Sequence, residues 1–125
     1  KNNVILAKHI IYKINQNKKD KLLKSLVKQN KNKQIIIFVN QKDIANKLNI
    51  LFANKKIILI HEDLSYIQQT KNLKIFKSKQ AQILIISNII TKKINIKKPV
   101  LIINYEIPDF VNIFIDRINK INKIN

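Results

Sequence analysis

Ile35-Ile36-Ile37-Phe38-Val39-Asn40 is a continuous apolar run that ends in an amide side chain. A short run without polar alternation is typical of a strand that is buried on both faces of a parallel sheet. Similar runs occur at Ile10 to Ile14, Ile57 to Ile60, Ile83 to Ile86 and Val100 to Asn104. The chain therefore contains enough strand candidates for one parallel sheet.

Segments with a helical period separate these strands. Apolar residues repeat at helical spacing in Lys18 to Gln29, Lys42 to Phe52 and Ser65 to Lys77, and a last helix is expected near Asp109. Ser65 is the predicted N-cap of the third helix, because a serine hydroxyl can accept a hydrogen bond from a backbone N–H in the first turn. Alternating strands and helices predict an α/β fold with three layers, in which helices flank a mainly parallel central sheet.

The length of 125 residues fits one domain, and we expect residues 1–125 to form it, with a low-complexity tail at residues 118–125 that frays. The formal charge is +18 at pH 7, from 25 Lys and Arg against 7 Asp and Glu. Such a charge favours a polyanion as partner, and nucleic acid is the leading candidate. The dominance of Lys, Asn and Ile also fits A/T-rich codon bias, which could raise the charge without selection for binding.

Several classes of protein and site are excluded by composition. The chain has no cysteine, so it has no disulfides and no thiolate metal site, and we expect no metal ligands. No apolar stretch approaches the roughly 20 residues that span a membrane, and no signal-like segment follows the first residues, so we expect a cytoplasmic protein. The chain also has no glycine, so its tight turns depend on other residues, among which Asn and Asp tolerate left-handed φ best.

Polar residues follow the strands of the predicted sheet. They are Asn40-Gln41-Lys42, His61 to Ser65, Ser87-Asn88 and Tyr105 to Pro108. In an open parallel sheet, ligands bind in the loops at the carboxyl ends of the strands. Hydroxyl, amide and lysine side chains suit phosphate oxygens, whereas the few aromatic residues mostly belong to the predicted core. These loops therefore predict a site that recognises a nucleic-acid backbone without regard to sequence.

In this order and spacing, the phrases resemble the second RecA-like domain of DEAD-box RNA helicases. His61, Asp63, Leu64 and Ser65 match the family's H-G-D-L-S phrase, and Ser87 stands where the family has the Thr of its A-T-D phrase. The resemblance implies a RecA-like domain that contacts RNA and ATP. It further implies an N-terminal RecA-like domain outside this chain, which would hold most of the ATP and Mg²⁺, and a monomeric protein.

The resemblance also assigns roles to single residues. It implies RNA contacts for Asn40, His61, Ser65, Gln69, Ser87, Lys92 and Lys93. Asn95 and Arg117 would contact the nucleotide, and Lys120 and Lys123 would take the catalytic positions of the family's two arginine fingers. The chain departs from the family at Glu62, which replaces a glycine, and at Gln69, which replaces an arginine. Lysine at a finger position keeps the charge but loses the planar fork that fits a phosphoryl group.

The sequence thus favours the C-terminal domain of an ATP-dependent DEAD-box-like RNA helicase, which is not active as this chain alone. The alternatives are a non-catalytic basic RNA-binding module derived from a helicase and, from another class, a basic α/β protein that docks on an acidic partner. Two roles for His61 also stay open, since it either contacts phosphate or caps its own loop.

Overall fold

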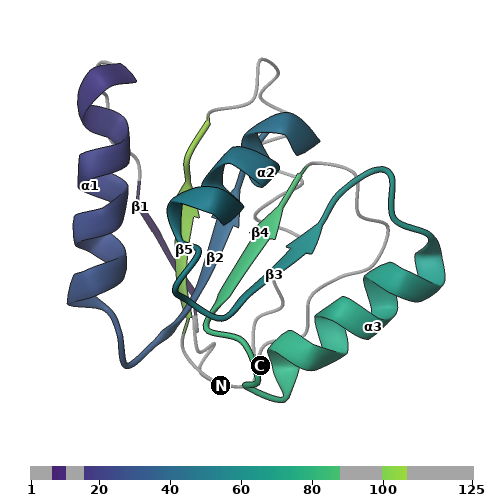
Figure 1. Ribbon diagram of the computed structural model, residues 1–125. Helices are drawn as coiled ribbons and strands as arrows, with labels where there is room; N and C mark the ends of the chain where they lie inside the picture. The colour runs from purple at the N-terminus through teal and green to yellow at the C-terminus, as the bar shows by residue number, and fades with distance from the viewer. Residues whose placement is uncertain (1–6, 11–15, 88–99, 107–125) are drawn as a thin grey trace, which may run out of the picture.

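The structure is a computed structural model, and it describes residues 7–10, 16–87 and 100–106 (Figure 1). Strands and helices alternate along these residues. They are β1 (Ala7–Ile10), α1 (Gln16–Gln29), β2 (Gln34–Phe38), α2 (Lys42–Leu51), β3 (Ile57–Ile60), α3 (Tyr66–Lys77), β4 (Ile83–Ile86) and β5 (Val100–Asn104).

The strands form one five-stranded sheet with the order β1-β5-β2-β4-β3, and every described pairing is parallel. In the centre of the sheet, Ile36 lies in register with Leu84 of β4 and with Ile102 of β5. All three side chains are completely buried, as expected for strands that are covered on both faces. The predicted parallel sheet flanked by helices is confirmed.

Two cores lie on opposite faces of the sheet and produce the three layers. Alternate residues of β2 point to opposite faces, because side chains alternate along a strand. Ile35 and Ile37 pack with residues of α1 and α2, whereas Ile36 and Phe38 pack with Leu73 and Phe76 of α3. Figure 1 shows the same arrangement, with α3 separated by the sheet from α1 and α2.

The ends of α3 show how this chain manages without glycine. Ser65 is the N-cap, and its hydroxyl accepts a hydrogen bond from the N–H of Gln68 at 3.1 Å, as predicted. At the other end the N–H of Lys79 bonds to Phe76 O and the N–H of Gln80 bonds to Ile75 O, which is the Schellman pattern. Lys79 has φ of 66°, in the left-handed region where glycine is preferred, so its Cβ costs about 1 kcal/mol there.

Some predicted elements lie partly or wholly outside the described residues. The first strand, predicted at Ile10 to Ile14, begins earlier in the structure, at Ala7, whereas residues 11–14 lie outside the described part. The predicted helix near Asp109 and the tail at residues 118–125 also lie outside the described part. No helix among the described residues is both long and apolar enough to cross a membrane.

Candidate nucleic-acid interface at the carboxyl edge of the sheet

The loops at the carboxyl ends of β2, β3, β4 and β5 meet at one edge of the sheet. We call this edge the rim and define it as residues 40–42, 61–65, 87 and 105–106. Hydrogen bonds join neighbouring loops: the N–H of Asn40 donates to Glu106 Oε1 at 2.8 Å, and the N–H of Ser87 donates to Ile60 O at 3.0 Å. The N–H of Tyr105 donates to Phe38 O, also at 3.0 Å. The predicted loops therefore form one continuous surface.

Ser87, the predicted RNA contact after β4, already binds an anionic group of the chain itself. Its side chain is completely buried, and its hydroxyl donates a hydrogen bond to Glu62 Oε1 at 2.8 Å. Glu62 belongs to the loop after β3 and is itself exposed to solvent. The residue that departs from the family's glycine thus occupies the hydroxyl that the resemblance assigns to RNA.

The Glu62 carboxylate has further donors around it. Burial alone raises the pKa of this carboxyl, but hydrogen bonds from its own N–H, from Ser87 and from the Lys42 N–H outweigh that effect, so its pKa lies below the ordinary value. Lys42 is the first residue of α2, and the N-cap Gln41 makes no side-chain capping bond. Glu62 therefore supplies a negative charge to a helix N-terminus, where the helix dipole favours it.

Lys42 also joins the loop after β3 through its side chain. Its ammonium group forms a salt bridge with Asp63, and both side chains are substantially exposed. The hydrogen bond from Lys42 and its positive charge lower the pKa of Asp63. The same hydrogen bond and the negative charge of Asp63 raise the pKa of Lys42. The Nδ1 of His61 accepts a hydrogen bond from the Asp63 N–H at 3.2 Å, so His61 caps its own loop.

Two further predicted RNA contacts, the N-cap residue of α3 and a residue in its first turn, stabilise the loop before that helix. The hydroxyl of Ser65 forms the N-cap described above. The amide of Gln69 donates to Leu64 O at 3.1 Å and is half-buried. Both side chains therefore hold the shape of the loop from His61 to Ser65.

A polar cluster at the far side of the rim was not predicted. The hydroxyl of Tyr105 donates to Asp20 Oδ1 at 2.5 Å, and Lys47 Nζ lies 3.7 Å from Asp20 Oδ2. Lys19 Nζ lies 4.2 Å above the Tyr105 ring, within cation–π range. These contacts fix α1 to the end of β5, and no sequence spacing could reveal them because the partners are 85 residues apart.

The structure brings together Asn40, His61, Ser65, Gln69 and Ser87 at the rim or in the first turn of α3. The remaining predicted site residues, Lys92, Lys93, Asn95, Arg117, Lys120 and Lys123, lie outside the described residues. Glu62 and Lys42 were not predicted as site residues. The signal that could have identified Glu62 is a carboxylate at the position where the matching phrase has glycine.

Residues 17–125 match the family of the helicase conserved C-terminal domain. The chain belongs to this family. ATP-dependent RNA helicase DRS1 from Candida glabrata is 30% identical over 107 residues, which are 82% of this chain and 15% of that protein. The pre-mRNA-splicing ATP-dependent RNA helicase PRP28 from Saccharomyces cerevisiae is 29% identical over 119 residues, or 93% of this chain and 20% of that protein.

Solved structures agree with these relatives. S. cerevisiae Dbp5 bound to RNA and ADP BeF3 has a TM-score of 0.72 and 25% identity, covering 86% of this chain and 29% of that one. The yeast DEAD-box splicing factor Prp28 has a TM-score of 0.69 and 26% identity, covering 93% of this chain and 26% of that one. The predicted resemblance is confirmed: the chain is a RecA-like C-terminal domain of the DEAD-box RNA helicase type, and it spans less than a third of these relatives.

Proposed function

We propose that this domain contacts RNA and ATP as the C-terminal half of an ATP-dependent RNA helicase, together with an N-terminal RecA-like domain. The RNA would be held by its backbone at the rim, without regard to base sequence. Dbp5, a structural relative, is bound to RNA and ADP BeF3. The family, the fold and the chemistry of the rim support the same role for this chain.

The binding of the Glu62 carboxylate is the observation that carries this proposal. A carboxylate and a phosphate diester both present a negatively charged oxygen to hydrogen-bond donors. The Ser87 hydroxyl and the Lys42 N–H both stabilise this carboxylate, and the N-terminus of α2 adds its dipole. Because these donors already bind one anionic group, they form a site of the right chemistry for another.

Glu62 gives this site a feature that a glycine would not. An RNA phosphate that is to bind Ser87 must displace the carboxylate, which then swings towards solvent. Intramolecular occupation lowers the apparent affinity, because only the fraction of molecules with a vacated site binds. We therefore expect weak, strongly salt-dependent RNA binding by this domain, with the affinity set in part by Glu62.

The nucleotide part of the proposal depends on residues that the structure does not describe. Asn95 and Arg117 are proposed to contact ATP, and Lys120 and Lys123 to stand near the transferred phosphoryl group. ATP would supply the free energy that drives closure of two domains around RNA. The described residues contain no group of three His, Asp or Glu side chains that could hold a metal ion, and the proposal assigns Mg²⁺ to the partner domain.

RNA binding by the rim is tested with Ser87→Ala in the 125-residue chain. We expect the affinity for a single-stranded oligonucleotide to fall by about tenfold at fixed salt, since a hydrogen bond to a charged group is lost. Ser87→Thr, which keeps the hydroxyl, should retain binding. Ser25→Ala removes an exposed hydroxyl from α1 and serves as the control. Unchanged affinity in folded Ser87→Ala would remove the proposed contact.

Catalysis is tested with the intact gene product that carries this domain. RNA-stimulated ATP hydrolysis is the expected result. Lys120→Arg combined with Lys123→Arg should then raise turnover, because arginine restores the planar fork. Salt-sensitive RNA binding without any ATP turnover would instead indicate a non-catalytic RNA-binding module.

A further inference from the structure

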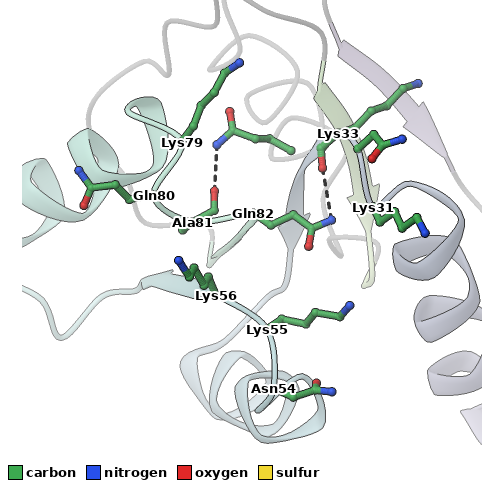
Figure 2. A pocket seen from close by; sticks show the side chains of 11 residues that line it. Lys31, Lys33, Asn54, Lys55, Lys56, Lys79, Gln80, Ala81 and Gln82 are labelled. Atoms are coloured by element: carbon green, nitrogen blue, oxygen red, sulfur yellow. Dashed lines mark hydrogen bonds between the residues drawn. The ribbon is translucent and has the colours of Figure 1, made fainter.

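A lysine-lined hollow lies at the amino edge of the sheet, at the opposite ends of the strands from the rim. Three turns surround it, and they lead into the adjacent strands β2, β3 and β4. Its volume is about 600 Å³. Figure 2 shows the side chains of the three turns around this space. Five of the lining residues are lysines, namely Lys31, Lys33, Lys55, Lys56 and Lys79.

The acidic side chains of the described residues lie away from this hollow. None of the described residues that line the hollow is acidic. Glu62, Asp63 and Glu106 belong to the rim, Asp43 lies in the first turn of α2 beside it, and Asp20 binds the hydroxyl of Tyr105 at the end of β5. Codon bias can account for a high number of lysines, but it does not account for the absence of acidic residues among the described residues of this lining.

The hollow is held open by hydrogen bonds between its turns. The amide of Gln34 donates to Phe76 O at 2.7 Å and to Ala81 O at 2.9 Å, and the second of these bonds is drawn in Figure 2. The N–H of Gln82 donates to Lys56 O at 3.1 Å, which joins the turns before β3 and β4. Since the walls are fixed before any ligand arrives, binding requires little ordering of the backbone.

The chemistry of the lining indicates the class of ligand. Lysine ammonium groups are compact point charges that adapt to many anion shapes. Side-chain amides such as Asn54 and Gln80 add hydrogen-bond donors. No described lining residue is aromatic, so nothing in the lining offers a nucleobase a stacking surface. Dense negative charge is therefore the property that these walls recognise.

We propose that this hollow is a second anion site, separate from the rim, which binds a compact phosphate-rich anion. Inorganic tripolyphosphate is the probe for a free anion, and a single-stranded RNA oligonucleotide is the probe for backbone phosphates. The anion would neutralise lysines from all three turns at once and leave the rim accessible. This site is independent of the proposed helicase role, because none of its residues belongs to the rim.

The test is an NMR titration of the 125-residue chain at low salt. We expect tripolyphosphate to shift the amide resonances of residues 31–33, 54–56 and 79–82 more than those of α1. Lys55→Gln combined with Lys56→Gln should weaken binding about tenfold, as two charge-assisted contacts are lost. Lys21→Gln combined with Lys24→Gln makes the same change of charge on exposed positions of α1 and should have less than about a quarter of that effect.

Three outcomes would overturn the proposal. They are shifts spread evenly over all lysine-bearing segments, equal losses in the two double variants, and no response of the hollow to either probe. A response to RNA but not to tripolyphosphate would support the site and identify backbone phosphates as the source of its ligand. RNA binding that is lost in Ser87→Ala while the hollow still responds to tripolyphosphate would separate the two sites.

Discussion

Replacing Glu62 should increase the affinity of the rim for RNA. The carboxylate holds the Ser87 hydroxyl at 2.8 Å and accepts two backbone N–H groups. A buried hydrogen bond to a charged acceptor contributes about 1.5–3 kcal/mol. Because Glu62 is exposed to solvent, we take about 1.4 kcal/mol as the free energy of all the hydrogen bonds that its carboxylate accepts. That free energy corresponds to a factor of about ten in the competition with phosphate. We therefore expect Glu62→Gly to bind single-stranded RNA about tenfold more tightly.

Fluorescence anisotropy with a short uridine oligonucleotide at fixed salt measures this effect. Glu62→Gln removes the charge but keeps an acceptor for Ser87, so it should give about a threefold gain. Asp43→Asn is the matched control, because it removes a carboxylate from the exposed first turn of α2. In a Ser87→Ala background the gain from Glu62→Gly should shrink, since the two residues share one contact. Two results would refute the idea that RNA phosphate displaces the Glu62 carboxylate. One is a gain in affinity from Glu62→Gly no larger than that from Asp43→Asn, and the other is a gain that is unchanged in the Ser87→Ala background.

Further predictions concern stability. Phe38 is 1% exposed, so Phe38→Ala should lower the free energy of unfolding by about 3–5 kcal/mol in urea titrations, whereas Ile50→Ala at 76% exposure should change it by less than about 0.5 kcal/mol. Lys79→Gly should raise the melting temperature by about 4 °C because it relieves the left-handed φ, and Lys79→Ala, which keeps Cβ, should not. The depressed pKa of Asp63 means that its contribution to stability is present above its unfolded-state pKa and is lost as pH falls through the lower folded-state value. The raised pKa of Lys42 means that its contribution to stability is lost only when the pH rises through its folded-state pKa. The difference in free energy of unfolding between wild type and Asp63→Asn should therefore be constant near neutral pH and should disappear in acid.

The strands were the most predictable part of the fold. Ile57–Ile60, Ile83–Ile86 and Val100–Asn104 have the predicted bounds, because each is built on a short apolar run of strand length that is bounded by polar residues or by proline. The start of the first strand was predicted three residues too late, because β1 begins with residues that carry no apolar run and are extended through their pairing with β5. Its sequence, Ala-Lys-His-Ile, has no continuous apolar run.

Turn chemistry and side-chain contacts were harder to predict. Asn and Asp were favoured for left-handed turns, but the described residue with positive φ is Lys79, since the end of α3 imposes that conformation on whichever residue follows it. The rim position of Ser87 followed from its place after a strand. Its bond to Glu62 did not, because it depends on how two loops 25 residues apart lie against each other.

The hydrogen bond between Ser87 and Glu62 links the affinity of the rim for phosphate to the stability of the unliganded domain. Among the described residues, no buried side-chain nitrogen or oxygen lacks a hydrogen-bond partner, and Glu62 satisfies the hydroxyl of Ser87. Exchanging Glu62 for glycine frees the site for phosphate but leaves that hydroxyl unpaired until RNA arrives, and an unpaired buried hydroxyl is destabilising by about 1–3 kcal/mol. Tight binding and a stable unliganded domain therefore oppose each other at this position. In this sequence, the Glu62 carboxylate keeps the Ser87 hydroxyl paired as long as no other anion binds there.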